Sequence, residues 1–288
     1  MRSVLAACLL AVALPCAAQP RMINAQVTER ALAGSLQAAV RQAASTNTAP
    51  AWIAWSAPVA DGRSSMCCYD GDWQAGATGG RCRLEPGSAS TLMTPDSDRG
   101  VRLELPDTFF VFVRLENRQV ERVRMFSEDC GIEAGAVPLT WLTGVPPAES
   151  VAVLAETAGD LDANHRARKG ALSALAQHHA PEAVTALIRL ARDVPDARSR
   201  GDALFWLSQR AGARAAAAIT EAIERDPETQ VKKKAVFALS QLPPDESIPK
   251  LIELARTHRN PAVRKQAMFW LGQSNDPRAL GFFEQVLK

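Results

Sequence analysis

The chemistry open to the four cysteines Cys67, Cys68, Cys82 and Cys130 depends on their spacing. A structural zinc site usually has pairs of ligands two to four residues apart, and two adjacent thiolates do not easily reach one tetrahedral ion. A thiol redox centre would favour a C-x-x-C spacing, which this sequence lacks. We therefore predict no metal or cofactor and two structural disulfides that link Cys67 and Cys68 to Cys82 and Cys130, in unknown order. A labile Cys67–Cys68 bridge is the redox alternative.

The N-terminal residues 1–18 predict the compartment of these cysteines. Arg2 precedes an apolar run from Val4 to Leu14, and small residues follow up to Ala18, which is the layout of a secretory signal peptide. Cleavage near Ala18 would remove Cys8 and Cys16 and leave an even number of cysteines, which favours disulfides outside the cytoplasm. A lipid anchor on Cys16 is the alternative. No later apolar run approaches the ~18 residues of a transmembrane helix, so we expect a periplasmic or secreted protein.

A repeat of 32 residues runs through the C-terminal part. The segments KGALSALAQ, GDALFWLSQ, KKAVFALSQ and KQAMFWLGQ begin at Lys169, Gly201, Lys233 and Lys265. A second apolar set with spacings of three and four follows each segment, which is typical of a second helix. Four helix pairs are therefore expected over residues 164–288, and such pairs must stack into a solenoid to bury their apolar stripes.

A polar residue and a cation four residues later recur at the start of each first helix. The polar side chain can accept hydrogen bonds from unpaired N–H groups, and the cation can bond an acid of its own or a neighbouring unit. We expect this structural ladder to comprise Asn164 and Arg168, Asp196 and Arg200, Glu228 and Lys232, and Asn260 and Arg264.

The repeat resembles the HEAT-repeat family in its short bacterial form, the phycobilisome-lyase-like HEAT repeat. The stretch NPAVRKQAMFWLGQSNDPRAL, Asn260–Leu280, is the segment most similar to the family pattern. The chain also resembles exported bacterial HEAT-repeat proteins of unknown activity. Residues 134–163, which contain PLTWLTGVPPAESVAVLAETA, are expected to form an irregular capping helix pair. The resemblance implies a curved helical scaffold for protein recognition and implies no lyase activity.

The part of the chain before residue 134 has a different pattern. Residues 19–49 are predicted to form a helix, within residues 21–44, and a linker. Residues 50–133 are predicted to form a small α+β module with an extended segment at Pro50–Val59 and a hairpin at Thr108–Ser127 that turns around Glu116–Gln119. Alternation in the first hairpin strand separates Phe110 and Phe112 from the odd-numbered apolar residues, and alternation in the return strand groups Val120, Arg122, Arg124 and Phe126.

The distribution of charged residues bears on which partner the chain binds. Residues 19–164 carry 12 basic and 18 acidic side chains, a net charge of about −6, and residues 165–288 carry 20 and 13, about +7. This asymmetry could dock the two domains on each other or steer an anionic partner to the C-terminal half. The outward positions of the second helices carry alternating signs, which suit a protein or peptide better than a polyanion. The predicted partner-binding residues are Arg189, Arg192, Glu221, Glu224, Lys250, Glu253 and Arg256.

We find no catalytic constellation in the sequence. The H-E-x-x-H, G-x-S-x-G and phosphate-loop motifs are absent from it, and His178–His179 is expected to be an exposed turn. The recurring aromatics are expected to pack between repeats, and Lys233 and Lys234 to face solvent without a nucleic-acid role. We predict a mainly α protein, a C-terminal α-solenoid of HEAT-type helix pairs with a small N-terminal α+β disulfide-bearing module, that acts as a non-enzymatic scaffold. The alternative is an exported thiol-active or metal-assisted enzyme or redox sensor centred on Cys67, Cys68 and Cys82.

Overall fold

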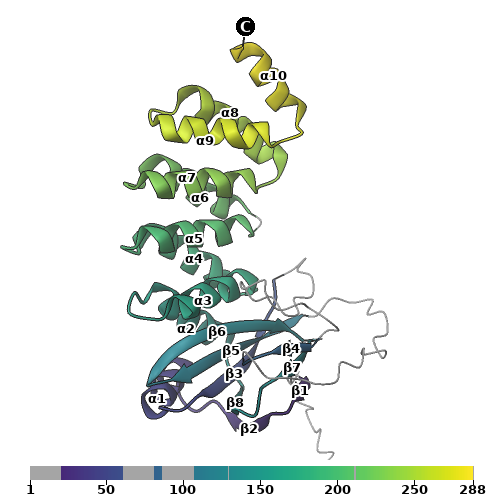
Figure 1. Cartoon of the computed structure of the whole chain (residues 1–288), viewed down its shortest axis with the longest axis vertical. Helices are drawn as coiled ribbons and strands as arrows, with labels where there is room; N and C mark the ends of the chain where they lie inside the picture. The colour runs from purple at the N-terminus through teal and green to yellow at the C-terminus, as the bar shows by residue number, and fades with distance from the viewer. Residues whose placement is uncertain (1–20, 61–80, 86–106, 129, 211, 288) are drawn as a thin grey trace, which may run out of the picture.

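The structure is a computed structural model that describes residues 21–60, 81–85, 107–128, 130–210 and 212–287. Figure 1 shows a β-sheet module at one end and a stack of helices that rises from it to the C-terminus. The predicted signal peptide, Cys67 and Cys68 lie outside the described residues. Within them, no helix is long and apolar enough to cross a membrane.

The main sheet has five strands in the order β2-β8-β3-β5-β6. The strand β3 pairs antiparallel with β5 and parallel with β8, and β2 pairs parallel with β8 at the edge. The predicted extended segment and hairpin are confirmed by β3, β5 and β6. The bounds are β2 Gln26–Ala31, β3 Ala51–Pro58, β5 Thr108–Glu116, β6 Gln119–Ser127 and β8 Pro138–Thr143.

The β5–β6 hairpin turns at Asn117 and Arg118, whose φ angles are 52° and 63°. Two consecutive residues with positive φ define the type I′ turn, whose twist matches that of the flanking strands. A register shift between Arg114 and Leu115 places Leu115 opposite Val120. Because of this irregularity, Val120 packs on the helix-covered face, whereas Phe126 lies on the opposite face. The predicted grouping of Val120 with Phe126 is therefore wrong.

A second, smaller sheet covers the aromatic face of the main sheet. Its parallel strands lie in the order β1-β7-β4, with bounds β1 Arg21–Ile23, β4 Arg81–Arg83 and β7 Gly131–Glu133. The core between the sheets contains Phe110 and Phe112 together with the buried Trp52 and Trp141. Phe110 contacts Trp141 edge to face at 5.4 Å between ring centroids, an arrangement that aromatic pairs favour.

The N-terminal helix is shorter than predicted. The helix α1 spans Leu36–Thr46, and Ser35 caps it by accepting a hydrogen bond from the N–H of Ala38. The predicted helical region from residue 21 instead contains β1 and β2. Both strands pair in parallel with segments more than a hundred residues later in the chain, so their conformation depends on partners that local periodicity does not reveal.

The predicted capping helix pair is also wrong in its first half. Residues 138–143 form β8, a strand between β2 and β3, and only α2, Pro147–Gly159, is helical. Gly144 ends the strand with a φ of 72°, which glycine adopts without steric cost. The cap of the solenoid is therefore a sheet with one helix.

Eight helices follow in four antiparallel pairs, as predicted, each first helix beginning near a ladder residue. Pro occupies the first turn of several of them, where its missing N–H has no intrahelical role. The bounds are α3 His165–Gln177, α4 Pro181–Asp193, α5 Ala197–Ser208, α6 Ala213–Arg225, α7 Thr229–Ser240, α8 Pro244–Thr257, α9 Pro261–Gly272 and α10 Pro277–Val286.

Aromatic rings link successive first helices. The rings of Phe205 and Phe237 stack at 6.0 Å with an interplanar angle of 3°, and Phe237 lies 4.9 Å from Trp270. The predicted packing of the recurring aromatics between repeats is confirmed for Phe205, Phe237 and Trp270, whereas Phe269 is 53% exposed.

The first repeat packs directly on the sheet. Gly170 of α3 faces β6 so closely that a Cβ there would lie 2.0 Å from the carbonyl oxygen of Val123. The C-terminal end of α3 bonds the residues after β3, because the N–H of Ala60 donates to Gln177 and the N–H of His179 donates to Pro58. One apolar core continues from the sheet into the helices, so the module acts as the N-terminal cap that a solenoid needs.

His178 lies in this junction and is fully buried, so the prediction that it belongs to an exposed turn is wrong for this residue. Its ring contacts Phe109 edge to face at 5.9 Å, and its Nδ1 accepts a hydrogen bond from the N–H of Ala180. Burial, together with the positive charges of Arg210 and His179, lowers the pKa of His178 to about 4. The imidazole is therefore neutral near pH 7.

Candidate binding surface on the second helices

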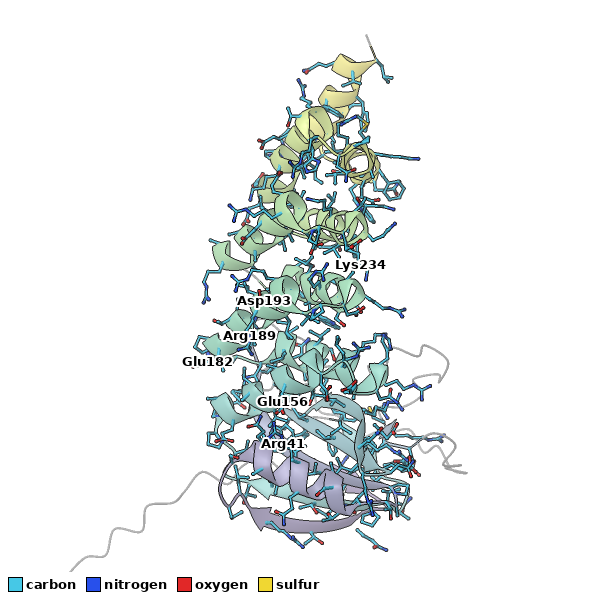
Figure 2. The ribbon with its side chains drawn as sticks, turned by 90° about the vertical axis from the view of Figure 1, so that its left-hand side faces the viewer. Arg41, Glu156, Glu182, Arg189, Asp193 and Lys234 are labelled. Atoms are coloured by element: carbon cyan, nitrogen blue, oxygen red, sulfur yellow. The ribbon has the colours of Figure 1, made fainter. Side chains whose placement is uncertain are left out.

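The second helices α4, α6 and α8 form one face of the solenoid. Their inward positions, Leu187, Ile219 and Leu251, are 0–1% exposed, and the charged residues point the other way. In Figure 2, Glu182 and Arg189 of α4 lie on one side of the stack and Lys234 of α7 lies on the other. The structure brings all seven predicted partner-binding residues to this face.

Charges of both signs on this face pair with their neighbours. Arg192 Nε donates to Asp193 at 2.7 Å, and Arg225 donates to Glu221 at 3.3 Å across one helical turn. The hydrogen bond from Arg192 lowers the pKa of Asp193. The pKa of Arg192 is raised first by its bond to Asp193 and also by the negative charge of Glu221 on the next helix. These exposed pairs contribute little to folding and leave a surface with mixed charge.

A hollow lies on this face between α4 and α6. Its apolar lining includes Ile188 and Ala191 of α4 and Ala218 and Ala222 of α6, and its charged rim includes Arg192, Glu221 and Arg225. An apolar hollow with a few charged groups at its edge is typical of binding sites for small groups or single side chains.

The repeat register explains the hollow. Ala222 occupies the position that Leu190 holds one repeat earlier and Leu254 holds one repeat later. Leu190 of α4 fills the space beside α2. A Cβ atom built on Gly159 of α2 would lie 3.3 Å from the Cδ2 atom of Leu190. Leu190 and Leu254 are 5% and 9% exposed. The hollow therefore lies where the second repeat has an alanine in place of the leucine of its two neighbours, a difference that can be read from the sequence.

Two of the predicted partner-binding residues have structural roles further along the stack. Arg256 Nη2 donates to Gln285 Oε1 at 2.6 Å and its guanidinium lies 5.4 Å from the ring centroid of Phe282, so it holds α10. Glu224 Oε2 lies 3.8 Å from Nε2 of the buried His258. The part of the face around α4 and α6 is therefore more open to a partner than the part around α10.

The ladder residues cap helices as predicted, with one exception. Asn164, Asp196 and Asn260 accept hydrogen bonds from backbone N–H groups of the first helical turn. Glu228 occupies the same position without a side-chain cap bond.

Two ladder cations pair with an acid of their own or a neighbouring repeat, as predicted, and the other two bond backbone carbonyls instead. Arg200 pairs with Asp226 rather than with Glu228, and Arg168 lies 3.9 Å from Asp196. Lys232 donates to two backbone carbonyls at the end of α6, and Arg264 donates to two just after α8. These cations satisfy carbonyl groups that a helix end leaves unpaired, so the ladder is structural and separate from the candidate surface.

The two cysteines within the described residues lie in the core between the two sheets. Cys82 in β4 is 1% exposed and Cys130, just before β7, is fully buried. The sulfur atoms of both cysteines have an interaction partner within the chain. The pairing with Cys67 and Cys68 stays a prediction because those residues lie outside the described ones. The described residues contain no group of three or more potential metal ligands.

The helical part is an α-solenoid whose repeating unit is a pair of antiparallel helices. The family described as HEAT repeats matches residues 216–288, which confirms the predicted resemblance for these residues.

No curated protein matches the chain in sequence. Among solved structures, human deoxyhypusine hydroxylase in complex with glycerol is 21% identical, with a TM-score of 0.36 over 47% of this chain and 43% of that one. The YibA protein of E. coli is 20% identical, with a TM-score of 0.33 over 49% of this chain and 54% of that one. This chain thus spans about half the length of both. The first of these proteins is by name an enzyme, and the alignment transfers no activity to this chain.

Proposed function

We propose that this protein is an exported, non-enzymatic scaffold that binds a protein or peptide on the face formed by α4, α6 and α8. The observation that carries the proposal is the hollow at Ala222. HEAT repeats typically serve as scaffolds for protein interactions, and α6 has alanine at Ala222, beside α4, where the neighbouring repeats have Leu190 and Leu254.

The hollow suits an apolar anchor side chain of a partner. Binding energy in protein interfaces concentrates in a few side chains that fill desolvated pockets. The apolar residues of the lining offer such a pocket, and Glu221 and Arg192 on its rim can pair with a cation and an anion of the partner. Rim charges of both signs select partners by pattern more than they add affinity. The partner segment is therefore a leucine-like or aromatic residue flanked by charges.

Export and two disulfides are part of the same proposal. The signal-like leader supports export, and the even number of remaining cysteines supports disulfides. The burial of Cys82 and Cys130 argues against the alternative of a thiol-active enzyme at these two residues, since reactive thiols need access to solvent.

The proposal is tested by selecting a displayed library of random peptides on the mature chain, with counter-selection on the variant Ala222→Leu. Leucine at this position should fill the hollow as it does in the neighbouring repeats, so the surviving peptides should share an apolar residue next to charges. The matched control is Ala213→Leu, an exposed alanine in the first turn of the same helix. Peptides that bind wild type and Ala213→Leu but not Ala222→Leu support the site. Peptides that bind all three equally would place the binding surface elsewhere.

A further inference from the structure

The first helices form a second face, distinct from the candidate surface. The helices α3, α5, α7 and α9 lie side by side as a layer along the stack (Figure 1). In α5, α7 and α9, the positions i, i+3, i+4 and i+7 counted from Arg198, Gln230 and Ala262 lie on the side away from the second helices. In α3 the same side packs on β6 at Gly170, and Arg166 and Lys169 stay exposed beside that contact. We call this set the outer face.

The outer face is strongly basic. It carries six cations and a single acid, so its net charge is about +5, whereas the face of the second helices carries mixed charge. The acid, Asp202, is already paired with Lys234 at 2.8 Å. The cations of the outer face are Arg166, Lys169, Arg198, Lys233, Lys234 and Lys265. The two lysines expected to be merely solvated, Lys233 and Lys234, thus belong to a basic area that extends over all four repeats.

Phenylalanines lie one helical turn from these cations. Phe237 follows Lys233 and Phe269 follows Lys265 by four residues, and Phe205 occupies the same register on α5. Phe205 and Phe237 stack on each other, so their ring faces are occupied by this contact. Phe269 is 53% exposed. The phenylalanines therefore add apolar surface beside the cations. The stacked rings of Phe205 and Phe237 leave little room for bases or sugars to stack on them.

We propose that the outer face docks peripherally on a membrane surface rich in anionic phospholipid headgroups. The cations are spread over a layer of four adjacent helices, which suits an extended surface better than a linear polymer. Lysine stems can lie along the surface with their ammonium groups at the phosphates, and Phe269 can enter the interface as aromatic side chains do in peripheral helices. A face with five uncompensated cations is attracted to negative headgroups within the screening length.

The proposal predicts salt-dependent binding to anionic vesicles. Each cation near such a surface strengthens partitioning by about fivefold, the equivalent of ~1 kcal/mol. Co-sedimentation of the mature chain should therefore be strong with vesicles of phosphatidylglycerol and phosphatidylcholine in equal parts, and weak with phosphatidylcholine alone. Raising the salt from 0.1 M to 1 M shortens the screening length from ~10 Å to ~3 Å and should release the protein.

The decisive comparison is between two double charge reversals. Lys233→Glu with Lys265→Glu alters the outer face and should weaken vesicle partitioning by tenfold or more. Arg30→Glu with Arg118→Glu changes the net charge equally on exposed positions of the sheet module and should leave most of the partitioning intact. Circular dichroism and thermal unfolding check that both variants fold. Equal losses in the two variants would show attraction by net charge alone and would overturn the proposal. Stronger binding to duplex DNA or to poly-glutamate than to the anionic vesicles would also overturn it.

Discussion

The guanidinium of Arg200 and the carboxylate of Asp226 form a bidentate pair within the second repeat, between the start of α5 and the end of α6. The Nε–Oδ2 distance is 2.8 Å and the Nη2–Oδ1 distance is 3.1 Å. The two side chains are only 7% and 5% exposed. Arg200 also donates to the carbonyls of Val194 and Pro195, so one side chain fastens the end of α4 and the end of α6 together.

Removing the acid of this pair should destabilise the solenoid strongly. In Asp226→Ala the guanidinium would stay buried without its partner, which costs ~3 kcal/mol or more. The control is Asp202→Ala, because its pair with Lys234 is 35–42% exposed and such pairs contribute ~1 kcal/mol or less. Urea unfolding measures both free energies. A loss at Asp226 no greater than that at Asp202 would contradict the structural role of the buried pair.

The contact between α3 and the sheet predicts a strong effect at Gly170. A methyl group there would meet the carbonyl oxygen of Val123 at 2.0 Å, so Gly170→Ala should push the first repeat away from its cap and lower the unfolding temperature by several degrees. Gly281 of α10 has no atom within 4 Å of a built Cβ. Gly281→Ala should therefore be neutral or stabilising, since alanine favours a helix. If both variants melt alike, the sheet does not cap the solenoid through this contact.

The buried His178 predicts a pH dependence of stability. Its folded-state pKa of about 4 lies below the ordinary value of 6.5, so below pH 6.5 the unfolded chain binds a proton that the native state does not. Stability should fall as the pH is lowered from about 6.5 to about 4, by ~3 kcal/mol in total. His178→Asn keeps an acceptor for the N–H of Ala180 but does not titrate. The difference in unfolding free energy between wild type and variant should therefore change over this range, and a constant difference would refute the assignment.

The disulfide proposal predicts the mass of the mature protein after alkylation. Material exported by the cell and treated with iodoacetamide without reductant should gain no label, and the same material should gain four labels after reduction in denaturant. Each bridge is expected to stabilise the module by ~2–4 kcal/mol. Uptake of two or more labels without reductant would exclude two disulfides.

The repeats could be predicted from sequence because their pattern is local and recurs four times. Ala203, Ala235 and Ala267 stand in the same register of the first helices, and all three are fully buried. The strands at residues 21–31 and 138–143 could not be predicted in this way, since they are short and their partners are remote. The same reason explains His178: its polarity suggested exposure, but the sheet that buries it belongs to a distant part of the chain.

The candidate surface was only partly predictable. The outward charges of the second helices follow from helical periodicity, as for Arg189 and Glu221. The hollow follows from a comparison of Leu190, Ala222 and Leu254 across repeats, but its openness required the positions of α4 and α6. The bonds of Arg256 to α10 could not be foreseen, because they depend on how the last helix folds back.

The central claim is that the hollow at Ala222 receives a partner in the compartment where the protein works. The most direct measurement is crosslinking and affinity capture in the producing cell with wild type, Ala222→Leu and Ala213→Leu, each with its thermal stability recorded. The account predicts one discrete partner with wild type and Ala213→Leu, and its loss with Ala222→Leu at unchanged or higher stability, since a leucine there fills a vacancy. Recovery of the same partner with Ala222→Leu would contradict the account.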